Sequence, residues 1–239
     1  MVKSKKTKYP PRKRVDSSEM AAEIRRELRG ILRRLDDLRR PMIPELAADH
    51  AERDDLQYVL PRLAAHEAII EDVITLAGMV WHLKDRLKRW LAASDLACSP
   101  TIEEIAASQK PLLICGDLID SKKHGGGSNR SGFAPTVGNI SFNPGGQIGL
   151  KYDGALKVAD FRVSNQTPIP FTVEIVSGDS QYTFGPAVTV ISKAFENWRN
   201  VINATDLLDG TGTECCELRR LLERFERGLT PIFYSEVVG

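Results

Sequence analysis

The stretch KPLLICGDLIDSKKHGGGSNRSGFAPTVGNISFN, residues 110–143, marks a change in the periodicity of the chain. Before it, apolar residues recur every three or four positions, which is typical of amphipathic helices. After Pro135 they alternate with polar residues, which is typical of strands with one buried face. The change predicts an α+β protein: a long-helix bundle with an inserted four-stranded antiparallel β-meander and a C-terminal helix packing back on the bundle.

The helical part has strong start and stop signals, such as Ser17 or Ser18 before the first helix and Pro41 after it. A glycine run at 125–127 follows the helix in the quoted stretch, and glycine permits the left-handed turn of a helix exit. Helices are predicted at about residues 17–40, 62–93, 101–107, 111–123, 186–203 and 217–227, with a short one near 51–60.

The first of these helices has a narrow apolar seam. Its apolar residues are spaced alternately three and four apart, and they are Ala21, Ile24, Leu28, Ile31, Leu35 and Leu38. A seam of this width is typical of coiled coils, so it requires a second helix, either from this chain or from another copy. Arginines crowd the other faces of the helix. We interpret them as solvated charges, with an RNA-binding face as the alternative.

The strands of the expected meander lie within residues 136–184 and are separated by turn residues such as Asn143-Pro144-Gly145-Gly146 and Asp153-Gly154. The chain then divides into four parts. They are a basic tail that we expect to be disordered (1–16), a helix with a proline-rich connector (17–61), a main domain (62–205) and a linker, helix and apolar tail (206–239). The main domain contains the helices of 62–124, the meander of 136–184 and the helix of 186–203.

Composition sets limits on the class of protein. Apolar residues make up 42% of the chain and charged residues 27%, with a net charge of +1, as in soluble globular proteins. No run reaches the ~20 apolar residues of a membrane span, and no apolar segment of a secretory signal follows the basic start. The four cysteines have no C-x-x-C spacing. We therefore expect a cytoplasmic protein with reduced thiols that does not enter a membrane.

The first fourteen residues contain seven Lys or Arg and no acid. Such a segment either keeps the protein soluble or acts as an electrostatic arm for nucleic-acid phosphates. RNA is therefore one expected partner, through this tail and the loop after the helix of 111–123, and a second copy of the chain is another.

Asp117, Asp120 and His124 are the candidate catalytic residues. They are spaced i, i+3 and i+7, so they share one face of a helix end. An imidazole held by a carboxylate is a common general acid/base arrangement. Lys122, Lys123 and Arg130 are the candidate nucleic-acid-binding residues, because their cations could hold a phosphate close by. The alternative is a polar helix end with a histidine that interacts with the helix dipole.

The segment Ile119-Asp120-Ser121-Lys122-Lys123-His124, preceded by a long helix, resembles the HEPN family of helical proteins. The resemblance covers about residues 62–125. It implies an RNA-associated protein of a bacterial or phage conflict system, such as a toxin or a phage-defence component, with His124 in the place of the family's catalytic histidine. Asp120 takes the polar position of the motif. Ile119 stands where the family has arginine, so an RNase mechanism requires Lys123 or Arg130 as the cation.

Other sites are not indicated. The glycines of 125–132 lack the Gly-Lys-Ser/Thr ending and the flanking strand and helix of a P-loop. A metal site from His82, Asp85, Asp117 and His124 would need two helices to pack in register, so we expect neither metal nor cofactor. Whether the chain is an enzyme stays open. The competing hypothesis is a non-enzymatic oligomeric assembly or adaptor protein that uses the seam of the first helix and the apolar C-terminal string.

Overall fold

The structure is a computed structural model that describes residues 17–46, 58–59, 66–93, 99–124, 130–142, 148–153, 158–163 and 168–204. Its helices are α1 (Ser17–Arg39), α3 (His66–Ala93), α4 (Ser99–Ser108), α5 (Lys110–His124) and α6 (Ala187–Ala204). Its strands are β1 (Glu45–Leu46), β2 (Tyr58–Val59), β3 (Thr136–Phe142), β4 (Ile148–Asp153), β5 (Val158–Val163), β6 (Phe171–Val176) and β7 (Thr183–Pro186). The predicted α+β class is confirmed. The predicted basic tail and C-terminal helix lie outside the described residues.

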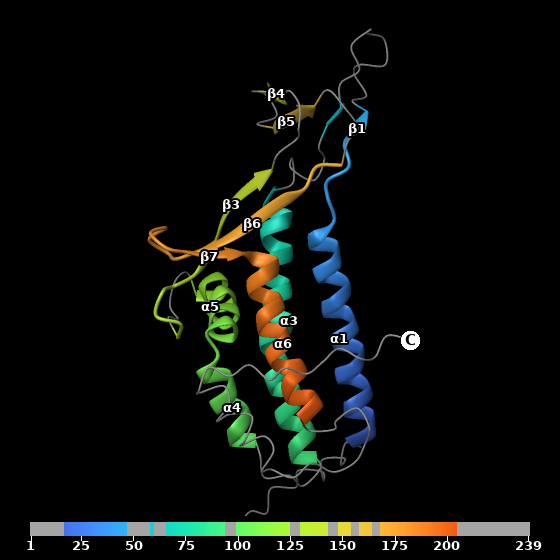
Figure 1. Cartoon of the computed structure of the whole chain (residues 1–239), viewed down its shortest axis with the longest axis vertical. Helices are drawn as coiled ribbons and strands as arrows, with labels where there is room; N and C mark the ends of the chain where they lie inside the picture. Colours follow the sequence, from blue (N-terminus) through green and yellow to red (C-terminus); the bar gives the residue numbers. More distant parts are fainter. Residues whose placement is uncertain are drawn as a thin grey trace, which may run out of the picture.

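Helix α3 is the centre of the bundle, and it packs against α1, α4, α5 and α6 (Figure 1). Its apolar stripe explains this position, because it is wide enough to face several neighbours at once. The stripe supplies ten buried side chains to the core, which are Ile69, Val73, Leu76, Ala77, Val80, Trp81, Leu83, Leu87, Trp90 and Leu91. The predicted helix of 62–93 is therefore observed from residue 66 onward.

The seam of α1 is buried inside this bundle. Five of its six predicted residues are buried, and the sixth, Leu28, is partly buried against the same core. Helix α1 packs mainly on α3 and also touches α6. The adaptor hypothesis requires this seam to be uncovered in the single chain. In the described residues the seam is covered by α3 and α6, so this part of the hypothesis is wrong. The apolar C-terminal string of the same hypothesis lies outside them.

Strands β3, β4, β5 and β6 occur where alternation predicted strands, but the four-stranded meander is wrong. Strands β1, β2 and β7 were not predicted. Strand β3 pairs antiparallel with β6 and not with its neighbour in sequence, and β7 completes a three-stranded sheet in the order β3-β6-β7. The β4–β5 hairpin belongs to a separate sheet in the order β1-β2-β5-β4. Alternation shows which side chains share a face of a strand, but it does not show which strand lies beside it.

The connector between α1 and α3 supplies the other edge of the second sheet. The two-residue strands β1 and β2 pair with each other, and β2 pairs with β5. Tyr58–Val59 therefore forms a strand where a short helix was predicted. Met42 and Ile169 also exchange two backbone hydrogen bonds of 2.8 Å. The three-stranded sheet lies against one end of the bundle, and the β4–β5 hairpin and β1 lie further out at the same end (Figure 1).

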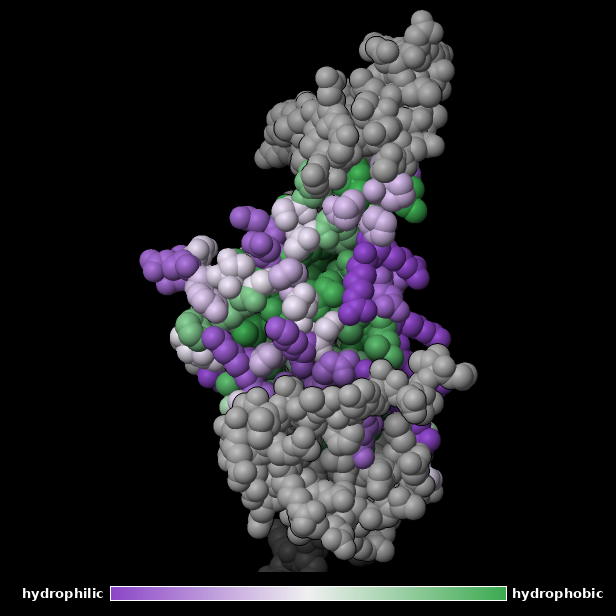
Figure 2. All heavy atoms as spheres, viewed as in Figure 1, coloured by the Kyte–Doolittle hydropathy of each residue, from purple (hydrophilic) through white to green (hydrophobic). Residues whose placement is uncertain are grey.

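Helix α6 covers the three-stranded sheet and returns the chain to the core. It contacts β6 and β7 as well as α3 and α5. Its largest buried side chains are Phe195 and Trp198, and Val173 and Ile175 of β6 are buried in the same cluster. The face of the molecule in Figure 2 shows hydrophilic and hydrophobic side chains interspersed between the grey parts. None of the described helices is long and apolar enough to cross a membrane.

Candidate functional site

Asp117 lies in the middle of α5 and is fully buried. Its two carboxylate oxygens accept hydrogen bonds from the backbone amides of Arg130 (3.0 Å) and Ser131 (2.7 Å). A buried carboxylate needs such donors, since its desolvation is otherwise costly. Asp117 therefore holds the segment that follows the glycine run against α5. This contact gives Asp117 a positioning role within the candidate site, and its membership of the acid/base set stays a prediction.

The hydrogen bonds from the Arg130 and Ser131 amides to Asp117 place Arg130 beside α5. Its Nη2 lies 2.7 Å from Oδ2 of Asp120, and its guanidinium carbon lies 5.2 Å from the centre of the Trp81 ring. Gly116 makes room for this arrangement, because a Cβ atom there would lie 3.0 Å from the Trp81 ring and 3.1 Å from Arg130 Nη1. The structure therefore brings together Asp117, Asp120 and Arg130, three of the six predicted site residues.

The other three predicted site residues lie at the C-terminal end of α5. Lys122, Lys123 and His124 belong to its last turn, but their side chains lie outside the described residues. Helix α5 continues to His124, so His124 stands four positions after Asp120 in an unbroken helix. Residues four apart are neighbours on a helix surface. Asp120 and His124 are therefore neighbours along the backbone of the helix, and their role as an acid/base pair stays a prediction.

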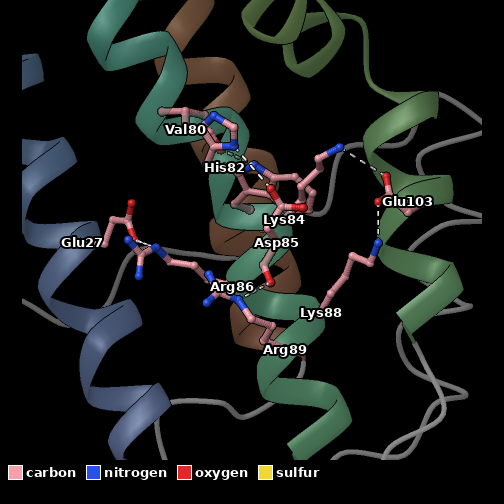
Figure 3. Close-up of polar contacts among 10 residues, drawn as sticks. Glu27, Val80, His82, Lys84, Asp85, Arg86, Lys88, Arg89 and Glu103 are labelled. Carbon is pink, nitrogen blue, oxygen red and sulfur yellow. Dashed lines mark hydrogen bonds and ion pairs between the residues drawn. The ribbon is translucent and has the colours of Figure 1, made fainter. Parts of the chain in front are cut away.

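Trp81 also contacts a second cationic side chain, Lys84. Lys84 Nζ lies 4.1 Å from the centre of the Trp81 ring, so this indole interacts with both Lys84 and Arg130. Lys84 also pairs with Glu103 of α4 at 3.5 Å, and Lys88 hydrogen-bonds to the same carboxylate at 2.6 Å. The Lys88 hydrogen bond lowers the pKa of Glu103. Figure 3 shows both lysines of α3 reaching Glu103.

On its other side, α3 is joined to α1 by charged contacts (Figure 3). Arg86 pairs with both Glu23 and Glu27 of α1. Burial raises the pKa of Glu27, while Arg86 acts in the opposite direction. His82 Nδ1 lies 3.3 Å from Asp85 Oδ2 one turn along α3. The Arg86 pairs connect α3 to α1, whereas the His82–Asp85 contact lies within α3. Pairs exposed on a surface contribute up to about 1 kcal/mol each.

His82 and Asp85 also line a hollow of about 470 Å³ between α1 and α3, together with Glu27, Arg86 and Arg89. Four of these side chains already take part in the contacts just described, since Arg86 pairs with Glu27 and His82 lies beside Asp85. Asp117 is on another face of the bundle's core and is occupied by backbone amides. Among the described residues there is no group of three His, Cys, Asp or Glu side chains placed to hold a metal ion.

One cluster was missed by the sequence reasoning. Phe133 and Tyr182 are 40% and 50% exposed, although large aromatic side chains are usually buried. Their rings are stacked, with centres 5.8 Å apart, and both meet Phe184 edge-on. Lys110 Nζ lies 4.4 Å from the centre of the Phe133 ring. The only sequence signal was an aromatic residue in a glycine-rich turn, so the grouping arises from the β3–β6–β7 pairing.

Cys115 is the one cysteine among the described residues. It is buried in α5, and burial raises the pKa of its thiol to about 12. A thiol of this kind is a poor nucleophile at neutral pH. Cys115 therefore contributes to the core of the bundle and not to the candidate site.

Comparison with known proteins supplied no further guidance. No family model, no curated protein and no solved structure matches this chain. The residues at the end of α5 and the segment that Asp117 holds there are therefore the features that bear on function.

Proposed function

We propose that this protein is a nucleic-acid-associated protein that binds RNA at the end of α5, with Arg130 as the phosphate-binding residue and His124 and Asp120 as an acid/base pair. The observation that carries the proposal is the position of the Arg130 guanidinium, 2.7 Å from the Asp120 carboxylate. Its side chain keeps 44% of its surface exposed, so it is accessible to a phosphate. Arginine is well suited to phosphate because of its planar array of donors.

The resemblance to the HEPN family required a cation that position 119 does not provide. Ile119 is 7% exposed and belongs to the core, so this position faces inward. Arg130 reaches the same helix from a different segment, next to the residue that aligns with the polar position of the motif. This placement supports Arg130 as the substitute for the missing arginine. A role in a bacterial or phage conflict system is part of the proposal through that resemblance.

The proposed chemistry is cleavage of RNA by its own 2′-hydroxyl. His124 would accept the hydroxyl proton as the oxygen attacks phosphorus, and the bond to the 5′-oxygen would break as that oxygen takes up a proton from water. The imidazolium would then return its proton to water. The products would be a 2′,3′-cyclic phosphate and a 5′-hydroxyl end. Arg130 would stabilise the negative charge on the phosphorane, and Asp120 would orient the imidazole.

The test compares the wild type with His124→Ala, Arg130→Gln and Arg130→Lys on single-stranded and structured RNA. We expect cleavage to be lost in His124→Ala while RNA binding is retained. Arg130→Gln should weaken both binding and cleavage, and Arg130→Lys should restore part of the binding, since it keeps the charge. Circular dichroism of each variant controls for folding.

Two results would count against the proposal. If the wild type binds RNA but does not cut it at high protein concentration, the catalytic part is wrong and a binding role stands. If the wild type binds no RNA, or if Arg130→Gln binds as tightly as the wild type, the proposed site is wrong.

A further inference from the structure

Phe133, Tyr182 and Phe184 form an aromatic platform beside the first residue of α5. Phe184 is partly buried against the core and supports the two exposed rings edge-on. Phe133 and Tyr182 are stacked with an angle of 24° between their planes. Exposed aromatic rings are uncommon without a partner, because each leaves much apolar surface in water.

The backbone fixes the position of these rings. Phe133 lies between Gly132 (φ 84°) and Ala134 (φ 43°), and Ser180 (φ 58°) lies in the turn that leads to Tyr182. A left-handed conformation is unfavourable for a residue other than glycine, because its Cβ atom lies too close to the following carbonyl oxygen. The carbonyl of Phe133 also accepts a hydrogen bond of 3.1 Å from the Gly178 amide. The turn that contains Phe133 and the turn that contains Gly178 and Ser180 are therefore joined by a hydrogen bond. Their positive φ angles are compatible with a functional surface.

The close approach of the two turns also depends on Gly178. A Cβ atom at this position would lie 2.9 Å from the carbonyl oxygen of Ala134, and that oxygen belongs to the backbone. A side chain there would force the turns apart. The rings are thus brought together by a backbone contact that tolerates only glycine, which makes the platform a preformed surface.

The charge around the platform favours an anionic ligand. Lys110 Nζ lies 4.4, 5.4 and 5.5 Å from the centres of the Phe133, Tyr182 and Phe184 rings. No carboxylate among the described residues forms an ion pair with it. Asp179 is the acidic residue of the neighbouring turn, but its carboxylate accepts hydrogen bonds from the Ser177 hydroxyl and the Gln181 amide.

The platform is continuous with the candidate site. Phe133 follows Arg130 by three residues, so their Cα atoms are at most roughly 10 Å apart. The segment between them runs along α5, since Arg130 is held at Asp117 and Asp120 while Phe133 contacts Lys110. A phosphate-binding arginine and an aromatic platform thus lie along one helix.

We propose that Phe133 and Tyr182 form a base-stacking subsite for single-stranded RNA, with Lys110 contacting the adjoining phosphate. This inference rests on the proposed RNA association and extends it by naming the part of the ligand that the platform recognises. Stacking on aromatic rings beside cations is the usual way in which proteins hold unpaired bases. Every base offers a π face, so the subsite should tolerate different sequences.

The test measures binding of two fluorescent probes by anisotropy, a short oligouridylate and an abasic ribose-phosphate chain of equal length. The background is His124→Ala, so that the probes are not cut. The variant Phe133→Leu/Tyr182→Leu keeps apolar side chains and removes the π faces. Tyr182→Leu alone is the second variant, and Ile43→Ala is the control because Ile43 is also exposed (68%).

We expect the parent protein to bind oligouridylate at least about fivefold more tightly than the abasic chain, since stacking of a base on an aromatic ring adds to the affinity. The double variant should lose this preference and Tyr182→Leu should lose part of it, while binding of the abasic chain stays unchanged. The Ile43→Ala control should keep the preference. Lys110→Gln should weaken binding of both probes and flatten the salt dependence of binding.

Three outcomes would overturn this inference, and the first of them leaves the proposal on which it rests intact. If Arg130→Gln weakens binding of both probes but the leucine variants keep the preference for oligouridylate, the stacking subsite is wrong and RNA association stands. If the parent protein binds neither probe, both are wrong. Equal binding of the two probes by the parent protein also overturns the subsite and would indicate a protein partner for the exposed rings.

Discussion

Trp198 Nε1 of α6 donates a hydrogen bond of 2.8 Å to the carbonyl oxygen of Val80 in α3. Both groups are buried, and 118 residues of sequence separate them. The indole thus fixes the position of α6 along α3, and α6 in turn covers the sheet that carries the aromatic platform. A single polar contact in the core therefore links the bundle to the surface proposed for RNA.

Replacement of this indole should weaken the fold. We expect Trp198→Phe to lower the free energy of unfolding by about 2 kcal/mol, because the hydrogen bond and part of the buried volume are lost. Urea unfolding followed by circular dichroism measures the change. Leu32→Ala is the control, since Leu32 is 43% exposed, and it should change the stability by less than about 0.5 kcal/mol. Equal effects of the two substitutions would contradict the role given to Trp198.

The hydrogen bonds of Asp117 to the Arg130 and Ser131 amides can be tested by how easily this segment opens. An amide oxygen can replace only one of the two carboxylate acceptors, so Asp117→Asn should destabilise the protein by about 1–3 kcal/mol. It should also speed cleavage by trypsin after Arg130, because local opening exposes that bond. Mass spectrometry identifies the cut.

The matched control for this prediction is Asp36→Asn. Asp36 pairs with Arg39 at an exposed position of α1, so this change should cost less than about 0.5 kcal/mol. It should leave the trypsin cut after Arg130 as slow as in the wild type. A rate of cleavage after Arg130 that is the same in Asp117→Asn and in the wild type would show that Asp117 does not hold the segment.

The contact between Glu103 and Lys88 predicts a dependence of stability on pH. The hydrogen bond from Lys88 lowers the pKa of Glu103 below its ordinary value of 4.5, so the folded protein binds fewer protons at this group than the unfolded chain. The contribution of Glu103 is therefore present above that value and is lost as the pH falls through the lowered pKa. Glu103→Gln should cost about 0.5 kcal/mol at neutral pH.

Unfolding curves of the wild type and of Glu103→Gln, measured from neutral to acidic pH, check this sign. The two proteins should converge at low pH, where the wild-type carboxyl is protonated. Glu104→Gln serves as the control, since Glu104 is an exposed neighbour on the same helix. A difference between wild type and Glu103→Gln that grows as the pH falls would refute the direction of the pKa shift.

Much of the helical architecture was predictable. In α1 and α3 the apolar residues are spaced three and four positions apart, and this spacing indicates which side of each helix is buried. Pro41 ends the first helix within two residues of its observed end at Arg39. The strand positions were predictable for the same reason, since alternation is a local property. Their pairing was not, because strands β3 and β6 meet across the inserted β4–β5 hairpin.

The candidate site was predictable only in part. Asp117, Asp120 and Arg130 were grouped because they lie within one short segment of sequence. Their different roles came from the fold, which buries Asp117 under backbone amides and leaves Arg130 accessible beside Asp120. The platform of Phe133 and Tyr182 had no local signal, since its two rings lie on turns that are far apart in sequence and meet at one end of the β3–β6–β7 sheet only when β3 pairs with β6.

The sequence by itself determined the α+β class, the described helices, strands β3 to β6 and the segment in which reactive side chains gather. These features depend on hydrophobic period and on turn residues, which act over a few neighbouring positions. The tertiary structure alone decided that β3 lies against β6, that the α1 seam is internal and that Arg130 meets Asp120. Such contacts depend on which distant surfaces are buried together, and many arrangements satisfy the same local pattern until the whole core is packed.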